Sequence, residues 1–82
     1  MYTVYVLKSK RNGKRYVGST GKSAESRLKE HNQGSNMWTK TNGPFDLVYQ
    51  ENFTDKTESI KREIFLKSGQ GRKLLDKIFI PG

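Results

Sequence analysis

Short apolar blocks along the chain predict three strands. The block Tyr2–Ser9 carries apolar side chains at both odd and even positions, which is typical of a strand buried on both faces and central in its sheet. Residues 10–14 contain Asn12-Gly13, a strong signal for a tight hairpin turn, and residues 15–19 return as a second strand. A third apolar block, residues 45–50, predicts a third strand.

Glycine at position 18 weakens the second strand intrinsically. We therefore expect Gly18 to mark a bulge or a close approach to the backbone. Residues 34–44 are polar and contain Gly and Pro, so they are expected to form a loop.

Helical spacing predicts three helices. Ser23 is a suitable N-cap for a helix over residues 24–32, and Gly34 is a natural stop. Thr54 or Asp55 can cap a second helix that runs to about residue 67 before a glycine-rich break at 68–71. A short third helix follows over about 72–79. The residues expected to face the core are Ala24, Leu28 and His31 in the first helix, Ile60 and Ile64 in the second, and Leu74, Leu75, Ile78 and Phe79 in the third.

The chain has 82 residues, which limits it to one domain, residues 1–82, with little room for a deep pocket for an organic cofactor. It contains no cysteine, so disulfides, thiolate zinc sites and cysteine nucleophiles are excluded. No segment approaches the roughly 20 apolar residues of a membrane span. The first residues are typical of a strand rather than a signal peptide. We expect a cytoplasmic protein with neither a membrane nor a small-molecule cofactor as partner.

The net charge is strongly positive. Sixteen lysines and arginines against eight acids give +8, a field that attracts a polyanion. Solubility alone explains such a charge in many small proteins. No predicted helix combines a basic face with a large apolar one, so a membrane surface fits less well than nucleic acid.

Two tyrosine triplets, Thr3-Val4-Tyr5 and Tyr16-Val17-Gly18, supply the most informative chemistry. The hairpin places both phenols on neighbouring strands. A phenol has an unperturbed pKa of about 10, so it needs a nearby cation or a metal-bound water to act as a base. We favour Tyr5 as general base and Tyr16 as the group that orients water or phosphate. In the alternative, both rings simply pack on the sheet.

Arg27 and His31 are four residues apart on the first predicted helix and can therefore face one spot. The Arg27 guanidinium suits phosphate oxygens. His31 could accept the Tyr5 proton or hydrogen-bond the phenol. The alternatives are a solvated surface arginine and a half-buried histidine that closes the helix end. Glu30 lies about 100° around the helix from His31, and we expect it in solvent.

Glu63 is the candidate metal ligand. Mg²⁺, or Mn²⁺ in its place, is commonly held by one or two carboxylates together with waters and substrate phosphate. The other acids are scattered, so a two-metal site is not supported. In the alternative, Glu63 forms an i,i+4 ion pair with Lys67.

For contacts with nucleic acid we select the basic residues near strand ends and in the polar segment, together with its one tryptophan. These are Lys14, Lys22, Lys40 and Trp38. Trp38 could stack on a base or ribose, or cover the small core. No segment resembles a base-reading helix, so phosphate contacts should dominate and sequence preference should be weak.

Taken together, these segments resemble the GIY-YIG nuclease superfamily, in particular its small stand-alone members. The two triplets stand at the family's spacing. The segment 27–31 looks like its arginine helix and 63–67 like its metal-binding glutamate segment, while segments 45–49 and 66–69 also match. The resemblance implies an α+β fold with a small three-stranded antiparallel sheet flanked by about three helices. It also implies cleavage of DNA with one divalent ion.

Two departures bear on the function. Thr3 stands where the name-giving motif has glycine, and no asparagine follows Glu63. No separate targeting domain is apparent. The missing asparagine and targeting domain favour the alternative of a non-catalytic basic nucleic-acid-binding module. Our prediction is a metal-dependent endonuclease that hydrolyses DNA phosphodiester bonds, with DNA repair or processing of structured DNA as candidate roles. DNA versus RNA and the oligomeric state stay open.

Overall fold

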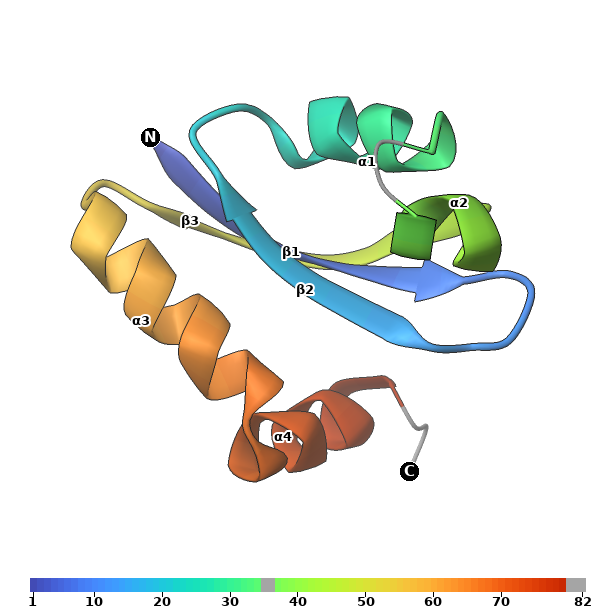
Figure 1. Ribbon diagram of the computed structural model, residues 1–82. Coiled ribbons are helices and arrows are strands. Elements are labelled where there is room, and N and C mark those ends of the chain that lie inside the picture. The colour runs from blue at the N-terminus through green and yellow to red at the C-terminus, as the bar shows by residue number, and fades with distance from the viewer. Residues whose placement is uncertain (35–36, 80–82) are drawn as a thin grey trace.

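The fold is one open antiparallel sheet covered by helices on both faces. The computed structural model describes residues 1–34 and 37–79, except for the side chains of residues 38, 39 and 79. Within this part of the chain, three strands lie in the order β2-β1-β3, and α1 and α2 cover one face while α3 and α4 cover the other (Figure 1). The elements are β1 Tyr2–Ser9, β2 Arg15–Thr20, α1 Ala24–Asn32, α2 Met37–Asn42, β3 Phe45–Phe53, α3 Lys56–Lys67 and α4 Gly69–Phe79.

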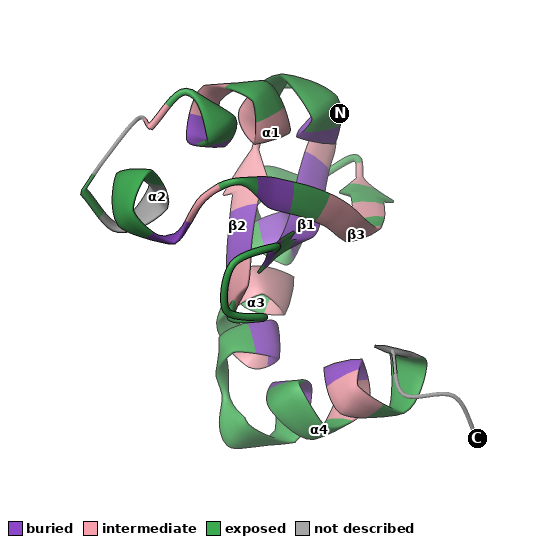
Figure 2. Cartoon of the chain, turned by 90° about the vertical axis from the view of Figure 1, so that its right-hand side faces the viewer, coloured by how far each residue is buried: buried purple, intermediate pink, exposed green. Residues whose placement is uncertain are grey.

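The central strand β1 is buried on both faces, as its apolar pattern predicts. Val4 and Val6 face α3 and α4, where they pack with Val17, Leu66 and Leu75. Tyr5 and Leu7 face the opposite layer and pack with Ala24 and Phe45. Figure 2 shows the sheet between α1 above and α3 and α4 below, with buried residues concentrated in β1. The α+β fold class with a three-stranded antiparallel sheet is confirmed.

The hairpin between β1 and β2 fixes which residues lie opposite each other. Gly13 in its turn has φ +76°, a left-handed conformation that glycine adopts without strain. The resulting register pairs Tyr5 with Gly18 and Leu7 with Tyr16. The two tyrosines of the triplets therefore project on the same face, two residue positions apart along the strands.

Four predicted boundaries differ from the structure. The second strand runs one residue further, to Thr20, and α4 begins at Gly69, inside the predicted glycine-rich break at 68–71. Residues 37–42 form the short helix α2 where a loop was expected, which brings the number of helices in the described residues to four. This segment contains neither Gly nor Pro, so a helical turn fits between the glycines at 34 and 43. The third strand extends to Phe53 because its residues pair with the central strand up to Tyr2↔Phe53, with Val48 left unpaired at a register shift.

The buried face of α3 was predicted wrongly. Ile60 and Ile64 are 39% and 63% exposed, and the sheet-facing positions belong to Ser59, Arg62, Glu63 and Leu66. Each polar member has a partner that compensates its burial. Ser59 donates to the Lys56 carbonyl, Arg62 pairs with Glu51 of β3 at 2.8 Å, and Glu63 accepts from Ser19 of β2.

Helix α4 begins directly after α3 at a sharp corner. The Ser68 side chain accepts from the Gly71 amide, and Gly71 packs so tightly that a Cβ there would overlap the Phe65 carbonyl oxygen and the Leu66 Cα. Leu75 of α4 is buried, whereas Ile78 is 45% exposed rather than on the core as predicted. The expected core position of Phe79 lies outside the described side chains. None of the described helices is long and apolar enough to cross a membrane.

The corner at Gly71 gives a direct test of this packing. Alanine normally favours a helix over glycine by roughly 0.8–1 kcal/mol. We nevertheless expect Gly71→Ala to lower the free energy of unfolding by about 1–3 kcal/mol, because the α3–α4 corner must open. Gly69→Ala is the matched control, since nothing lies within 4 Å of its Cβ. Urea unfolding followed by circular dichroism measures both, and equal stability of the two variants would contradict the corner as described.

Candidate active site

The Tyr5 ring lies across the backbone of the edge strand β2. Gly18 is its partner in the register, and a Cβ built on Gly18 would stand 2.5 Å from the Tyr5 hydroxyl oxygen. Glycine is therefore required here by the ring and not by a special φ. The expected close approach at Gly18 is present, and it carries the hydroxyl from the central strand out to the edge of the sheet.

Helix α1 presents two polar side chains to this hydroxyl. Ser23 caps the helix, as predicted, by accepting from the Ser26 amide. Arg27 and His31 then lie one turn apart on its inner face. The Arg27 Nε atom donates to the Tyr5 hydroxyl at 3.4 Å, and the His31 Nε2 atom lies 3.2 Å from the same oxygen. Three of the predicted site residues thus meet at one atom.

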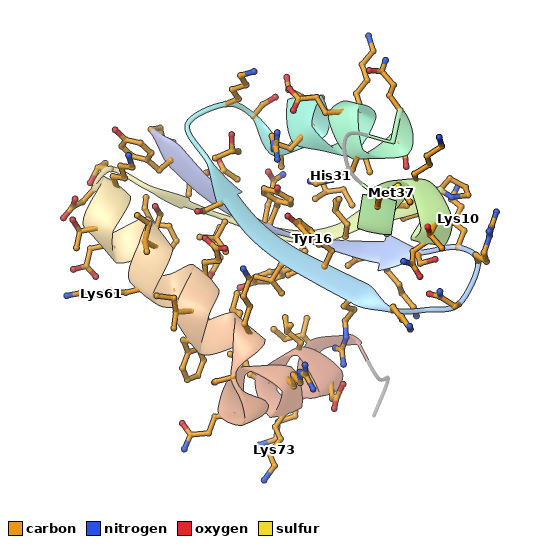
Figure 3. All side chains as sticks on the ribbon, in the orientation of Figure 1. Lys10, Tyr16, His31, Met37, Lys61 and Lys73 are labelled. Atoms are coloured by element: carbon orange, nitrogen blue, oxygen red, sulfur yellow. The ribbon has the colours of Figure 1, made fainter. Side chains whose placement is uncertain are left out.

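Tyr16 closes the cluster from the neighbouring strand. Its ring centroid lies 4.7 Å from that of His31 and 6.4 Å from that of Tyr5. Figure 3 shows the Tyr16 and His31 side chains between the sheet and α1. His31 is only 1% exposed, and its Nδ1 atom has no hydrogen-bond partner among the described residues. The bond to Tyr5 and the ring contacts therefore hold the imidazole in place.

Burial sets the protonation of both groups. Burial raises the pKa of the Tyr5 phenol, and the hydrogen bond and charge of Arg27 oppose this without reversing it. The cation that was expected to favour a phenolate is present, but desolvation outweighs it. Burial, reinforced by the Arg27 charge, lowers the pKa of His31. At neutral pH the pair is a neutral phenol beside a neutral imidazole, which can accept a proton.

Glu30 is not free in solvent as predicted. It forms ion pairs with Arg27 and, at 3.3 Å, with Lys22. The hydrogen bond from Lys22 is the main reason that the pKa of Glu30 is lowered. The hydrogen bond to Tyr5 raises the pKa of Arg27, so the guanidinium stays charged. Glu30 therefore accepts from the Nη1 atom of Arg27, and the Nε atom of Arg27 remains available to donate to the Tyr5 hydroxyl.

Glu63 reaches the same strand from the other face of the sheet. Its carboxylate accepts from the Ser19 hydroxyl at 2.6 Å and pairs with Lys67 at 2.6 Å. Ser19 follows Gly18, so the phenol and the carboxylate meet adjacent residues of one edge strand. Burial favours a higher pKa for Glu63, but the hydrogen bonds from Lys67 and Ser19 outweigh it, and the pKa is lowered. The carboxylate is ionised, and its charge contributes to raising the pKa of Tyr5.

The donor set around Glu63 fits a metal site with a single protein carboxylate. Its side chain is 19% exposed, so one edge is open to solvent, and the Ser19 hydroxyl lies beside it. Within the described residues, no group of three or more His, Cys, Asp or Glu gathers to hold a metal. A hard ion with one carboxylate would draw its other ligands from water and substrate phosphate. The ion pair between Glu63 and Lys67, which the sequence offered as the alternative role of Glu63, is also present. A metal ion that binds Glu63 would therefore displace the Lys67 ammonium.

The three lysines predicted to contact nucleic acid lie in different segments of the described structure. Lys22 is tied to Glu30, and Lys40 is exposed on α2. Lys14 lines a cavity on the α4 side of the hairpin. Trp38 belongs to α2, and its side chain lies outside the described ones. Ser19 was missed, because no local pattern reveals that a strand serine contacts a helix glutamate 44 residues later.

The comparisons with known proteins show the family of this chain. Residues 1–75 match the model of the GIY-YIG catalytic domain, and the chain belongs to the GIY-YIG family. It is 40% identical over 76 residues to UPF0213 proteins of Staphylococcus saprophyticus and Staphylococcus haemolyticus, with 92% of this chain and 90% of each relative covered.

A solved structure shares the fold. The solution NMR structure of a UPF0213 protein from Bacillus halodurans matches with a TM-score of 0.57 and 31% sequence identity. The match covers 96% of this chain and 86% of the other. The predicted membership of the GIY-YIG superfamily is thus confirmed.

The buried histidine makes stability depend on pH. The pKa of His31 is lowered on folding from an unfolded value near 6.5, so the unfolded chain binds more protons below about pH 6.5. Stability should therefore be full above about pH 6.5 and fall as the pH decreases through the folded pKa. His31 is the only histidine, and the lowered pKa values of Glu30 and Glu63 act at lower pH. Thermal unfolding between about pH 7.5 and 5.5 should show this slope in the wild type and lose it in His31→Gln; equal slopes would contradict it.

Proposed function

We propose that this chain is a divalent-metal-dependent endonuclease that hydrolyses phosphodiester bonds of DNA with weak sequence preference. One observation carries the proposal. The Tyr5 hydroxyl, which contacts Arg27 and His31, lies against Gly18, while Glu63 is held by the next residue, Ser19. The side chains that we assign as base, cation and metal ligand thus approach two adjacent residues of the edge strand β2, Tyr5 and its partners from the α1 face and Glu63 from the α3 face.

The proton path follows from the neutral Tyr5–His31 pair. Tyr5 takes a proton from the attacking water while its own proton passes to the His31 Nε2 atom, 3.2 Å away. This relay needs no phenolate at rest, so it is compatible with the raised pKa of Tyr5. Tyr16, whose ring contacts the His31 ring, orients the water or the phosphate.

Charge stabilisation falls to Arg27 and to the carboxylate site. Arg27 remains protonated and has donors beyond those used by Tyr5 and Glu30 with which to bind a phosphate oxygen. Glu63 would hold Mg²⁺ or Mn²⁺, with Ser19 beside it. When bound, such an ion stabilises the negative charge that develops on the phosphate and the leaving oxygen.

Replacing the carboxylate tests the proposal. Glu63→Gln keeps the size of the side chain but removes its charge, and it should slow nicking of supercoiled plasmid by at least about 100-fold in Mg²⁺ or Mn²⁺. Glu58→Gln is the matched control, because Glu58 lies on the same helix and also pairs with a lysine, Lys61 at 3.8 Å. Its rate should equal that of the wild type.

Two results would overturn the catalytic reading. One is background-level nicking by the wild type and Glu63→Gln alike across divalent ions and substrate shapes. The other is nicking that persists in EDTA. Salt-sensitive binding of DNA that ignores both EDTA and Glu63→Gln would then favour a non-catalytic nucleic-acid-binding module.

A further inference from the structure

A cavity on the α3–α4 face of the sheet has no role in the proposed chemistry. It has a volume of about 500 Å³ and lies between the hairpin end of β2 and the α3–α4 corner. In Figure 1, α4 lies beneath this end of β2. The floor is apolar and consists of Val17, Leu66 and Leu75, which also form the core.

The walls of the cavity are cationic. They contain Lys14, Arg15, Lys67 and Arg72, and none of the described residues that line the cavity is acidic. Two of these cations are neutralised, since Arg15 pairs with Asp76 and Lys67 pairs with Glu63. Lys14 and Arg72 are exposed, and neither makes a side-chain hydrogen bond or ion pair within the described residues. Two positive charges with no partner among the described residues therefore line the same groove.

The position of Arg72 is unfavourable for the helix that carries it. It lies near the N-terminal end of α4, whose first turn contains no acid, so its charge adds to the positive end of the helix dipole. Asp76 follows at i+4 and could have paired with it, but Asp76 pairs with Arg15 instead. Stability of α4 gives no reason for a cation there, whereas binding of an anion does.

The groove also leads to the candidate active site. Lys67 lines it and contacts the Glu63 carboxylate, and Tyr16 lines it from the strand. From Lys14 to Ser19 the strand advances by about 16 Å at roughly 3.3 Å per residue. A chain of phosphates that follows this edge of β2 would pass from Lys14 and Arg72 to the carboxylate.

We propose that this groove binds the phosphodiester backbone of the strand to be cut, on one side of the scissile bond. The assignment rests on the proposed nuclease function for its place relative to the reaction, but binding itself needs no catalysis. Lys14 and Arg72 hold backbone phosphates, and the apolar floor accommodates a sugar. The shared chemistry of DNA and RNA backbones suits the groove, so the experiment compares both.

The test measures binding without metal. Fluorescence anisotropy of labelled DNA and RNA oligonucleotides of one sequence in EDTA gives Kd for Lys14→Ala/Arg72→Ala and for the control Lys61→Ala/Lys73→Ala. Both doubles remove two charges. Lys61 and Lys73 project away from the sheet (Figure 3). The groove variant should bind at least about 10-fold more weakly and reduce the slope of log K against log salt by about 1.4–1.8. Equal Kd values and slopes for the two doubles would overturn the groove.

Cleavage separates this proposal from the proposed function. The groove variant should raise KM with little change in kcat, whereas Glu63→Gln should lower kcat and retain binding. If the wild type binds through the groove but never cleaves, the groove stands and the nuclease function fails. If cleavage depends on Glu63 but the groove variant and the control double variant have the same KM, the proposed binding role of the groove is wrong and the nuclease function stands. If the groove variant binds DNA more weakly but binds RNA like the wild type, the groove is assigned to DNA.

Discussion

The close approach of Tyr5 to Gly18 is the contact on which the arrangement of this protein depends. A tyrosine in a central strand normally directs its hydroxyl into the layer above the sheet. Here the absence of a side chain at Gly18 lets the ring lie across the neighbouring strand, with the hydroxyl oxygen 2.5 Å from the place a Cβ would take. The rest of the site is built around that oxygen.

Helices on opposite faces of the sheet can serve one site because β2 is an edge strand. Arg27 and His31 reach the phenol from the α1 face, and Glu63 reaches Ser19 from the α3 face. In a strand with neighbours on both sides, the backbone and its partners would separate these groups. In the proposed function, a site at an edge leaves room for a nucleic-acid strand, which we propose to follow the cationic groove.

The sequence was sufficient to predict most of the fold and the residues that gather around the Tyr5 hydroxyl, namely Tyr16, Arg27 and His31. β1 and α1 were predicted with their observed bounds, because a run of apolar residues on both faces and an N-cap are local signals. The inner face of α3 was not predictable from Ile60 and Ile64, since Arg62 and Glu63 face the sheet only through partners on distant strands. Such partners are not encoded by spacing along the helix.

The same limit applies to the electrostatics. A cation beside Tyr5 was foreseeable, but the extent of burial, which decides the sign of the pKa shift, depends on packing from both strands and α1. The uncompensated charge of Arg72 likewise became apparent only when Asp76, its natural i+4 partner, proved to contact Arg15 of another element. Long-range competition for partners, rather than local propensity, distinguishes the groove from ordinary surface charge.

The most direct measurement is the cleavage rate of Gly18→Ala beside that of Gly21→Ala. A Cβ at Gly18 must displace the Tyr5 hydroxyl, whereas one at Gly21 meets only the Tyr2 ring at an ordinary 3.8 Å. With both variants shown to be folded by circular dichroism, the account predicts that Gly18→Ala loses about 100-fold in rate through misplacement of Tyr5. Gly21→Ala should cleave like the wild type. A folded Gly18→Ala that cleaves at the wild-type rate would contradict the account.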